Sequence, residues 1–255
     1  MHSNALSRIL PCLALILSLA PALDAAKAQA GIHPLWDKYL NIYEDRRDLP
    51  ELSFQGRIVG DWTERPEKQF MDAWPYRGAT YEILCATGKD LARLIYGLAL
   101  HTHDLDPSVD LGRFERGAQG FHYSTDQIAA WANDVLAGTF PLHTAEELAF
   151  LGWLTEDGIL ELDGGAVRPG DGPTHVLGAA PGKRRSMEFN LRHERLHVMW
   201  DEDDSFRQEF TGLWETLSEE EHEAVFEDLS GYDRTNLPNI IEEWAVRSRE
   251  SETGW

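Results

Sequence analysis

Apolar residues recur at intervals of three and four along much of this chain, the spacing that places them on one face of a helix. In two of these segments, a Ser or Thr stands three residues before a Gln or Glu, the capping-box pattern that begins a helix. These pairs are Ser124 with Gln127 and Thr144 with Glu147. We expect helices over residues 33–46, 89–100, 124–136 and 144–154, and two more that begin near Ser205 and Ser218.

Short segments with β character lie between these helices. Residues 52–62 and 76–84 contain β-like runs separated by Pro and charged residues. Residues 159–162 and 174–177 read as two more strands on either side of a connection rich in Gly and Pro. The strand at 174–177 is either an arm of a plain hairpin or a sheet edge that pairs with an extended ligand. Together the patterns predict an α+β fold that is predominantly helical and has a small sheet.

The strongest chemical signal is the segment His193-Glu194-Arg195-Leu196-His197, which has the HExxH pattern of a zinc site on a helix. Two residues four apart lie one turn apart on the same helix face, so both imidazoles can reach one metal ion. Glu194 is turned about 100° away, where it can contact a water that the metal activates. This arrangement suits hydrolysis, in which the carboxylate accepts the proton of the water and passes it to the leaving group.

The residues around this segment favour a continuous helix. A chain of this composition contains the pattern by chance about once in thirty chains, so the context matters. No Pro or Gly interrupts residues 186–201, and apolar residues flank the motif on both sides. The alternative is a partly buried helix whose histidines only form hydrogen bonds within a core. That alternative is less favoured because two buried histidines and a buried carboxylate would each need a partner.

A zinc site needs a third protein ligand and an open fourth position. Asp201 follows His193 by eight residues on the same helix, which places it about 80° around and nearly 12 Å along the axis. We therefore expect Asp201 to orient a ligand or to cap the helix. Residues 239–246 predict a second helix, with Asn239 as the N-cap and Glu242 at the capping-box position. A carboxylate on this helix could complete the site.

The motif together with Glu242-Glu243-Trp244-Ala245 resembles the gluzincin division of the HExxH zinc metallopeptidases, over residues 186–250. In that family a glutamate on a later helix, in an ExxA or ExxxD setting, completes the metal site. The resemblance implies a zincin-like domain with His193, His197 and Glu242 as zinc ligands, Glu243 as the alternative ligand, and Glu194 as general base. The sequence departs from the ExxxD version at Val246, where an acidic partner of a ligating histidine would stand.

Other residues could assist or compete with this site. Tyr232, His222 and Arg234 lie between the two metal-binding helices and are candidates to stabilise the transition state. The pair His101 and His103 is spaced so that the side chains diverge on a helix end, which is unfavourable for a shared ligand. Residues 104–115 imitate a calcium loop, but Val109 stands where the turn of such a loop needs Gly.

The N-terminus predicts export. Arg8 precedes an apolar run over residues 9–19, and Ala28-Gln29-Ala30 forms a cleavage site of small residues. We expect a signal peptide at 1–30, an N-terminal α+β region at 31–185 and a helical zinc-site region at 186–255, the last two forming one compact domain. The alternative is an uncleaved N-terminal anchor. No later segment is apolar enough to span a membrane, so the mature protein would be secreted or periplasmic.

Charge and cysteine content narrow the function further. The formal net charge of −21 argues against nucleic acid or an anionic membrane as the main partner. Removal of the signal peptide leaves Cys85 as the single cysteine, which excludes an internal disulfide. The sequence thus predicts an exported zinc-dependent hydrolase, most simply a peptidase acting on peptides or proteins. The alternatives are a binding protein with a non-catalytic metal site and a secreted helical module with no metal.

Overall fold

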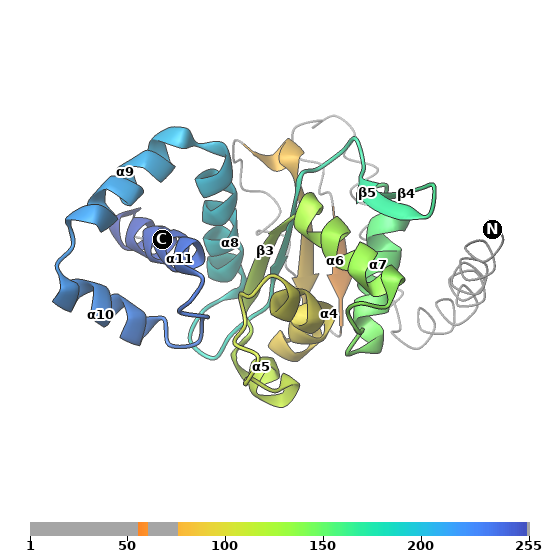
Figure 1. Ribbon diagram of the computed structural model, residues 1–255, viewed down its shortest axis with the longest axis horizontal. Helices are drawn as coiled ribbons and strands as arrows, with labels where there is room; N and C mark the ends of the chain where they lie inside the picture. The colour runs from red at the N-terminus through yellow and green to blue at the C-terminus, as the bar shows by residue number, and fades with distance from the viewer. Residues whose placement is uncertain (1–55, 61–75, 254–255) are drawn as a thin grey trace, which may run out of the picture.

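The computed structural model of the chain describes residues 56–60 and 76–253 (Figure 1). The predicted signal peptide and the predicted helix at 33–46 lie outside these residues. Within them, the chain forms eight α-helices and two small sheets, which confirms the mostly helical α+β fold. The helices are α4 (Gly88–His101), α5 (Leu111–Gly117), α6 (Thr125–Ala137), α7 (Ala145–Glu156), α8 (Met187–Glu202), α9 (Asp204–Thr216), α10 (Glu219–Asp228) and α11 (Leu237–Thr253).

The larger sheet has four strands in the order β1-β2-β6-β3. These strands are β1 (Gly56–Val59), β2 (Thr80–Cys85), β6 (His175–Ala179) and β3 (Gly120–Ser124). The first three run parallel, and β3 pairs with β6 in the antiparallel direction. A separate hairpin joins β4 (Leu160–Asp163) to β5 (Ala166–Pro169). The antiparallel strand β3 therefore forms one edge of the larger sheet.

Both interpretations of the segment 174–177 are wrong. The strand there, β6, lies between β2 and β3, so it is neither a sheet edge nor an arm of a hairpin. All five of its residues are buried, as expected for a strand covered on both faces. The strand at 160–163 pairs instead with β5 through a turn at Gly164 and Gly165, whose φ angles of 58° and 92° suit a tight hairpin.

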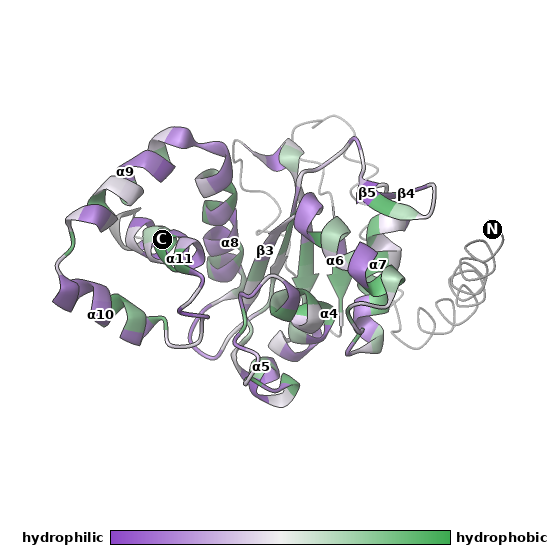
Figure 2. Cartoon of the chain, viewed as in Figure 1, coloured by the Kyte–Doolittle hydropathy of each residue, from purple (hydrophilic) through white to green (hydrophobic). Residues whose placement is uncertain are grey.

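Side chains on the two faces of the sheet pack against different helices. Ile83, Phe121 and Val176 join the main core, to which α4, α6 and α7 contribute. Leu84 and Ala179, which point to the opposite face, pack against Met187 and Leu191 of α8. The strands of this sheet are largely hydrophobic in Figure 2. Helix α8 is thus fixed on one face of the sheet, with α9, α10 and α11 on its other side (Figure 1).

Most predicted helix starts agree with the structure. Ser124, Thr144 and Ser218 each form a complete capping box, and the Ser186 side chain caps α8. Helix α9 begins earlier than predicted, because the Asp203 side chain accepts hydrogen bonds from the backbone of residues 205 and 206.

The predicted N-cap at Asn239 is wrong. Helix α11 already begins at Leu237, and the side chain of Asn236 accepts a bond from the backbone of Asn239 at 3.4 Å. The Asn239 amide instead donates to the Asp104 carboxylate at 3.0 Å. In the part of the chain that the structure describes, no helix is both long and apolar enough to cross a membrane.

Candidate metal centre

The HExxH motif lies on α8, and contacts with the sheet fix the rotation of this helix about its own axis. Met187 and Leu191 pack into the sheet near the start of the helix. One turn later, Arg195 forms a two-pronged ion pair with Glu82 of β2, at 2.8 and 3.2 Å, and both side chains are buried. A buried charge pair of this kind resists rotation of the helix, because breaking it would leave an unpaired charge. His193 and His197 consequently lie on the flank of α8 that α11 covers.

Three side chains converge where α8 meets α11. The Nε2 atoms of His193 and His197 lie 3.4 Å apart. Glu243 of α11 faces both of them, with one oxygen 3.5 Å from Nε2 of His193 and the other 3.3 Å from Nε2 of His197. All three residues are buried. Imidazole and carboxylate are common metal ligands, so this group could hold a metal ion.

Two further carboxylates contact the opposite nitrogens of the histidines. Glu250 lies 3.0 Å from Nδ1 of His193, and Glu242 lies 2.7 Å from Nδ1 of His197. Such contacts fix the ring orientation and leave Nε2 free to bind a metal. Arg247 donates to Glu243 at 2.6 Å and orients that carboxylate in turn.

The structure therefore places the two glutamates of the EEWA segment differently from the first expectation. Glu243, the alternative, faces the pair of Nε2 atoms, whereas Glu242 contacts the far nitrogen of His197. Adjacent residues on a helix point about 100° apart, so only one of them can enter the group. Val246 is a fully buried apolar residue, and the acidic partner of His193 is Glu250, one turn further along.

The neighbouring carboxylates raise the pKa values of both histidines. Burial alone lowers the pKa of His193, but hydrogen bonds to Glu243 and Glu250 outweigh burial and raise that pKa to about 9. Hydrogen bonds to Glu242 and Glu243 likewise raise the pKa of His197 well above its usual value, against the effect of burial. The three carboxylates thus stabilise positive charge at the two imidazoles, whether a proton or a bound cation supplies it.

Glu194 lies beside the histidines but outside their group. Its side chain is buried against β3, where a Cβ atom added to Gly120 would come within 2.0 Å of the carboxylate oxygen. Burial raises the pKa of Glu194 to about 7, although the two neighbouring histidines oppose this shift. A carboxyl with such a pKa can both accept and return a proton near neutral pH.

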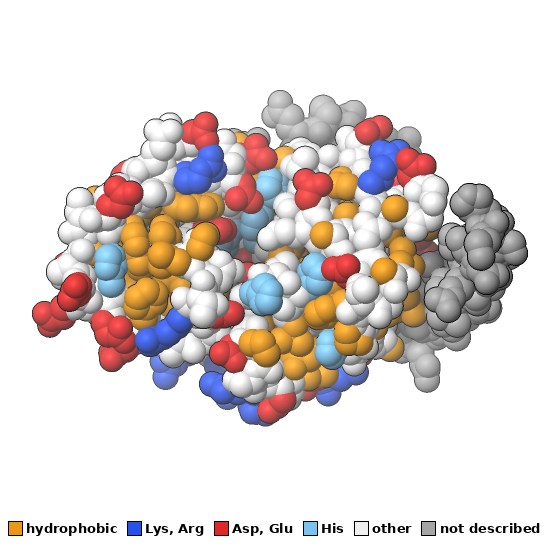
Figure 3. Space-filling model, in the orientation of Figure 1, with side chains coloured by type: hydrophobic (Ala, Val, Ile, Leu, Met, Phe, Trp, Pro, Cys, Tyr) orange, Lys and Arg blue, Asp and Glu red, His pale blue; other side chains and the backbone are white. Residues whose placement is uncertain are grey.

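A cavity of about 610 Å³ opens onto the group. Its wall includes His193, Glu194, His197 and Glu243, and also residues 119–123 along and just before β3. In Figure 3, histidine and acidic side chains are visible in the depression between the sheet side of the molecule and the lobe of α9, α10 and α11. The cavity gives a ligand access to both the candidate metal ligands and the edge strand.

The three predicted transition-state stabilisers lie in different places. Tyr232 lines the cavity and interacts with Glu243. His222 instead packs against Trp214 in a tilted ring contact, with centroids 4.4 Å apart, and Arg234 is exposed and pairs with Glu223. Of the three, Tyr232 alone lies on the cavity wall within the described residues.

Asp201 has two histidine neighbours that the sequence did not single out. Its carboxylate lies 3.5 Å from His122 on β3 and 3.7 Å from His175 on β6, and these three form a second group that could hold a metal ion. A third grouping, His122 with His197 and Glu242, shares one histidine with each of the other two. A sequence signal for His122 was its place in the alternating run Phe121-His122-Tyr123, which indicates a strand with His122 on the opposite face from the two aromatics.

The remaining sequence candidates have other roles. His101 pairs with Asp134 of α6 at 2.8 Å. Asp110 caps α5, and Asp106 accepts a bond from the backbone of Ser108, so these residues of the calcium-like segment serve local turns. Cys85 is buried and free, and burial raises its pKa well above the usual value.

Comparison with protein families, with curated proteins and with solved structures finds no match to this chain.

Proposed function

We propose that this protein is an exported zinc-dependent hydrolase, most simply a peptidase. The observation that carries the proposal is the convergence of His193, His197 and Glu243. Two ligand atoms bound to one tetrahedral zinc ion at about 2.0–2.2 Å lie roughly 3.3–3.6 Å apart. The two Nε2 atoms lie 3.4 Å apart, which fits two ligands of one zinc ion, and each of them has its own Glu243 oxygen at 3.3 or 3.5 Å. The donor types and the spacing of the two nitrogens support zinc. Zinc bound there would polarise a water molecule and the carbonyl of a substrate.

The protein's own residues supply the proton transfers. Glu194 lies at the edge of the group and lines the cavity, where it can accept a proton from an attacking water and deliver it to the leaving group. Tyr232 lines the same cavity and carries a hydroxyl that can donate to a developing oxyanion. Glu242, Glu250 and Arg247 hold the ligands in position.

The edge strand supports a peptide as substrate. Strand β3 forms an edge of the sheet, and the cavity runs along its residues 120–123. An extended peptide can add to such an edge through backbone hydrogen bonds, which places its carbonyl groups near the metal ligands. This assigns to β3 the role that the sequence suggested for residues 174–177. The predicted signal peptide at 1–30 would deliver the enzyme to the periplasm or the exterior.

Replacement of Glu194 by Gln tests the chemistry. Zinc should stay bound in the E194Q protein, because Glu194 is not a ligand, while cleavage of internally quenched peptides falls by about 10²- to 10⁴-fold. Zinc is measured by elemental analysis of natively purified protein. The matched control is Glu188→Gln, the same change on the partly exposed side of the same helix.

Two results would contradict the proposal. Unchanged cleavage in the E194Q protein would refute the assigned base. A wild-type protein that holds one zinc ion yet cleaves none of a diverse peptide library would indicate a non-catalytic metal site.

A further inference from the structure

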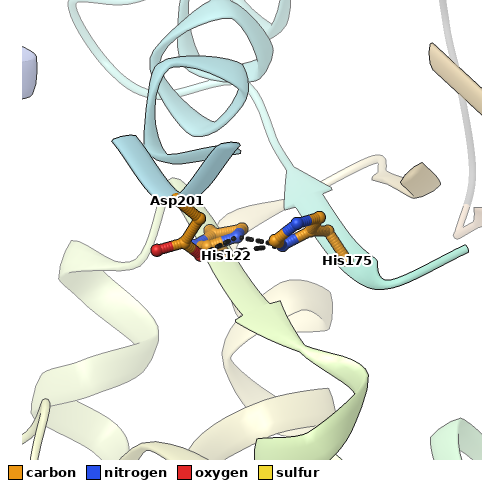
Figure 4. Close-up of side chains that lie close together, drawn as sticks. All are labelled: His122, His175 and Asp201. Atoms are coloured by element: carbon orange, nitrogen blue, oxygen red, sulfur yellow. Dashed lines mark hydrogen bonds and ion pairs between the residues drawn. The ribbon is translucent and has the colours of Figure 1, made fainter. Parts of the chain in front are cut away.

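We propose that His122, His175 and Asp201 form a second zinc site, separate from the HExxH group (Figure 4). Nε2 of His122 lies 3.0 Å from Nδ1 of His175. One oxygen of Asp201 lies 3.5 Å from the His122 nitrogen and 3.7 Å from the His175 nitrogen. The 3.5 Å separation lies within the roughly 3.3–3.6 Å expected between two ligands of one tetrahedral zinc ion, and the other two lie within about 0.3 Å of that range.

Three different elements build this group. His122 on β3 pairs across the sheet with Leu177 of β6, and His175 lies two residues before Leu177. Since side chains alternate along a strand, His122 and His175 point to the same sheet face as diagonal neighbours. That face is covered by α8, whose last turn carries Asp201 beside the ring of His122 (Figure 4). Backbone register thus fixes two of the three ligands.

The group also has the supporting contacts of a metal site. Nε2 of His175 lies 2.9 Å from Glu202, so the carboxylate can hold this nitrogen protonated and leave Nδ1 free to bind an ion. The His122 and His175 side chains are 8% and 5% exposed, whereas the Asp201 side chain is 38% exposed. His122 and Asp201 both line the 610 Å³ cavity, from which an ion and its remaining water can enter.

The donor set of two imidazoles and one carboxylate indicates which kind of metal ion the site would bind. Nitrogen donors favour zinc and its first-row neighbours over calcium and magnesium, which prefer oxygen ligands. The competing arrangement without metal is a simple hydrogen bond between His122 and His175. If that hydrogen bond is all that joins the two histidines, substitution of Asp201 should not change the binding of metal ions.

The second site would lie directly beside the first. The two groups share no ligand, but the ring of His122 stacks on that of His197 with centroids 5.8 Å apart and planes 8° apart. An ion at the second site would tie the C-terminal end of α8 to β3 and β6. It would thereby hold the edge strand, including Gly120, against the helix that carries Glu194.

Zinc titration of the full chain tests this inference. The protein is freed of metal with a chelator and titrated with Zn²⁺ in a calorimeter, and the wild type should bind two equivalents. Asp201→Asn and His175→Gln should each bind one equivalent, or bind the second at least tenfold more weakly. Asp204→Asn is the matched control, because Asp204 is three residues away and its side chain is 78% exposed. Asp201 is partly exposed, so its variant should fold even if the His175 variant does not.

The HExxH group is tested in parallel with His193→Gln, which should leave the second site able to bind one equivalent. A wild type that binds one equivalent, lost in His193→Gln but kept in both Asp201→Asn and His175→Gln, would overturn this inference and leave the proposed function intact. The reverse pattern, in which the one equivalent depends on Asp201 and His175, would support the second site and refute the first. The inference would also be overturned if the Asp201→Asn and His175→Gln proteins each still bound two equivalents of zinc with unchanged affinity.

Discussion

At the scale of single residues, the histidines of α8 are each held from two sides. Their Nδ1 atoms contact Glu250 and Glu242, and their Nε2 atoms face each other and Glu243. The tautomer with the proton on Nδ1 is favoured, because a carboxylate accepts from that nitrogen. When a metal ion displaces the proton on Nε2, the lone pair of that nitrogen points into the group. The charge of Glu243, paired with Arg247, completes a donor set that a divalent ion can share.

This arrangement predicts different effects for two neighbouring glutamates. Glu242→Gln should weaken zinc binding by about 10- to 100-fold, because it removes only a hydrogen-bond partner of His197. Glu243→Gln should weaken binding by more than that, because it replaces a carboxylate ligand by an amide. Competition with a chromogenic chelator measures both affinities. A larger loss in the Glu242 variant would reverse the assignment and restore the ligand that the family resemblance implies.

At the scale of elements, the contact between α8 and β3 places Glu194. Gly120 is the residue of β3 against which the carboxylate packs, and no side chain fits between them. The strand thus fixes Glu194 from one side, while the pair of Arg195 with Glu82 fixes the rotation of the helix from the other. The position of the proposed base is set by the packing of two elements.

A methyl group at position 120 should therefore disturb catalysis without removing the metal ligands. In Gly120→Ala the added Cβ would lie 2.0 Å from the Glu194 oxygen, so the Glu194 side chain must move. Since displacement of a reacting group by about 1 Å can cost roughly 10²-fold in rate, peptide cleavage should fall by about that factor while zinc content stays the same.

The control for this experiment is Gly212→Ala in α9, where the added Cβ would meet no atom within 4 Å apart from its neighbours and the backbone of its own helix. That change should leave cleavage unchanged and raise stability by about 0.5–1 kcal/mol, because Ala favours a helix more than Gly does. Full peptide cleavage by the Gly120→Ala protein would show that the contact with β3 does not position Glu194.

At the scale of the whole molecule, α11 is attached to α8 through three carboxylates and two histidines. An ion in the HExxH group would therefore link the C-terminal helix to the sheet side of the protein. Ligands that bind only the folded state stabilise it, by about 4 kcal/mol when free zinc exceeds its dissociation constant a thousandfold. For a domain of this size, we expect a rise in melting temperature of roughly 10 °C over protein kept in a chelator.

Scanning calorimetry in chelator and in buffered zinc measures this shift. Hydrogen exchange should show faster opening of α11 in the chelator, while the core of α4 and β2 stays protected. The Glu243→Gln protein should lose the part of the shift that comes from the HExxH group. Equal melting temperatures of the wild type in both buffers would show that no ion links the two helices.

The extent to which the sequence predicted the fold depends on the range of the interactions involved. Capping boxes at Ser124, Thr144 and Ser218 involve residues three apart, and these helices begin where predicted. The pairing of β6 with β2 and β3 joins residues far apart in the chain, which a local pattern cannot reveal. For the same reason, the interpretation of residues 174–177 as a hairpin arm or an edge was wrong.

In the candidate site, too, the sequence predicted the local relationships and the tertiary structure decided the long-range ones. The sequence by itself determined that His193 and His197 share a helix face, because helical periodicity fixes residues four apart. Only the tertiary structure decided that Glu243 faces them, because the rotation of α11 depends on how Ile240 and Val246, both fully buried, pack. The tertiary structure alone also brought together His122, His175 and Asp201, since strand register and the end of α8 place residues that no spacing in the chain connects.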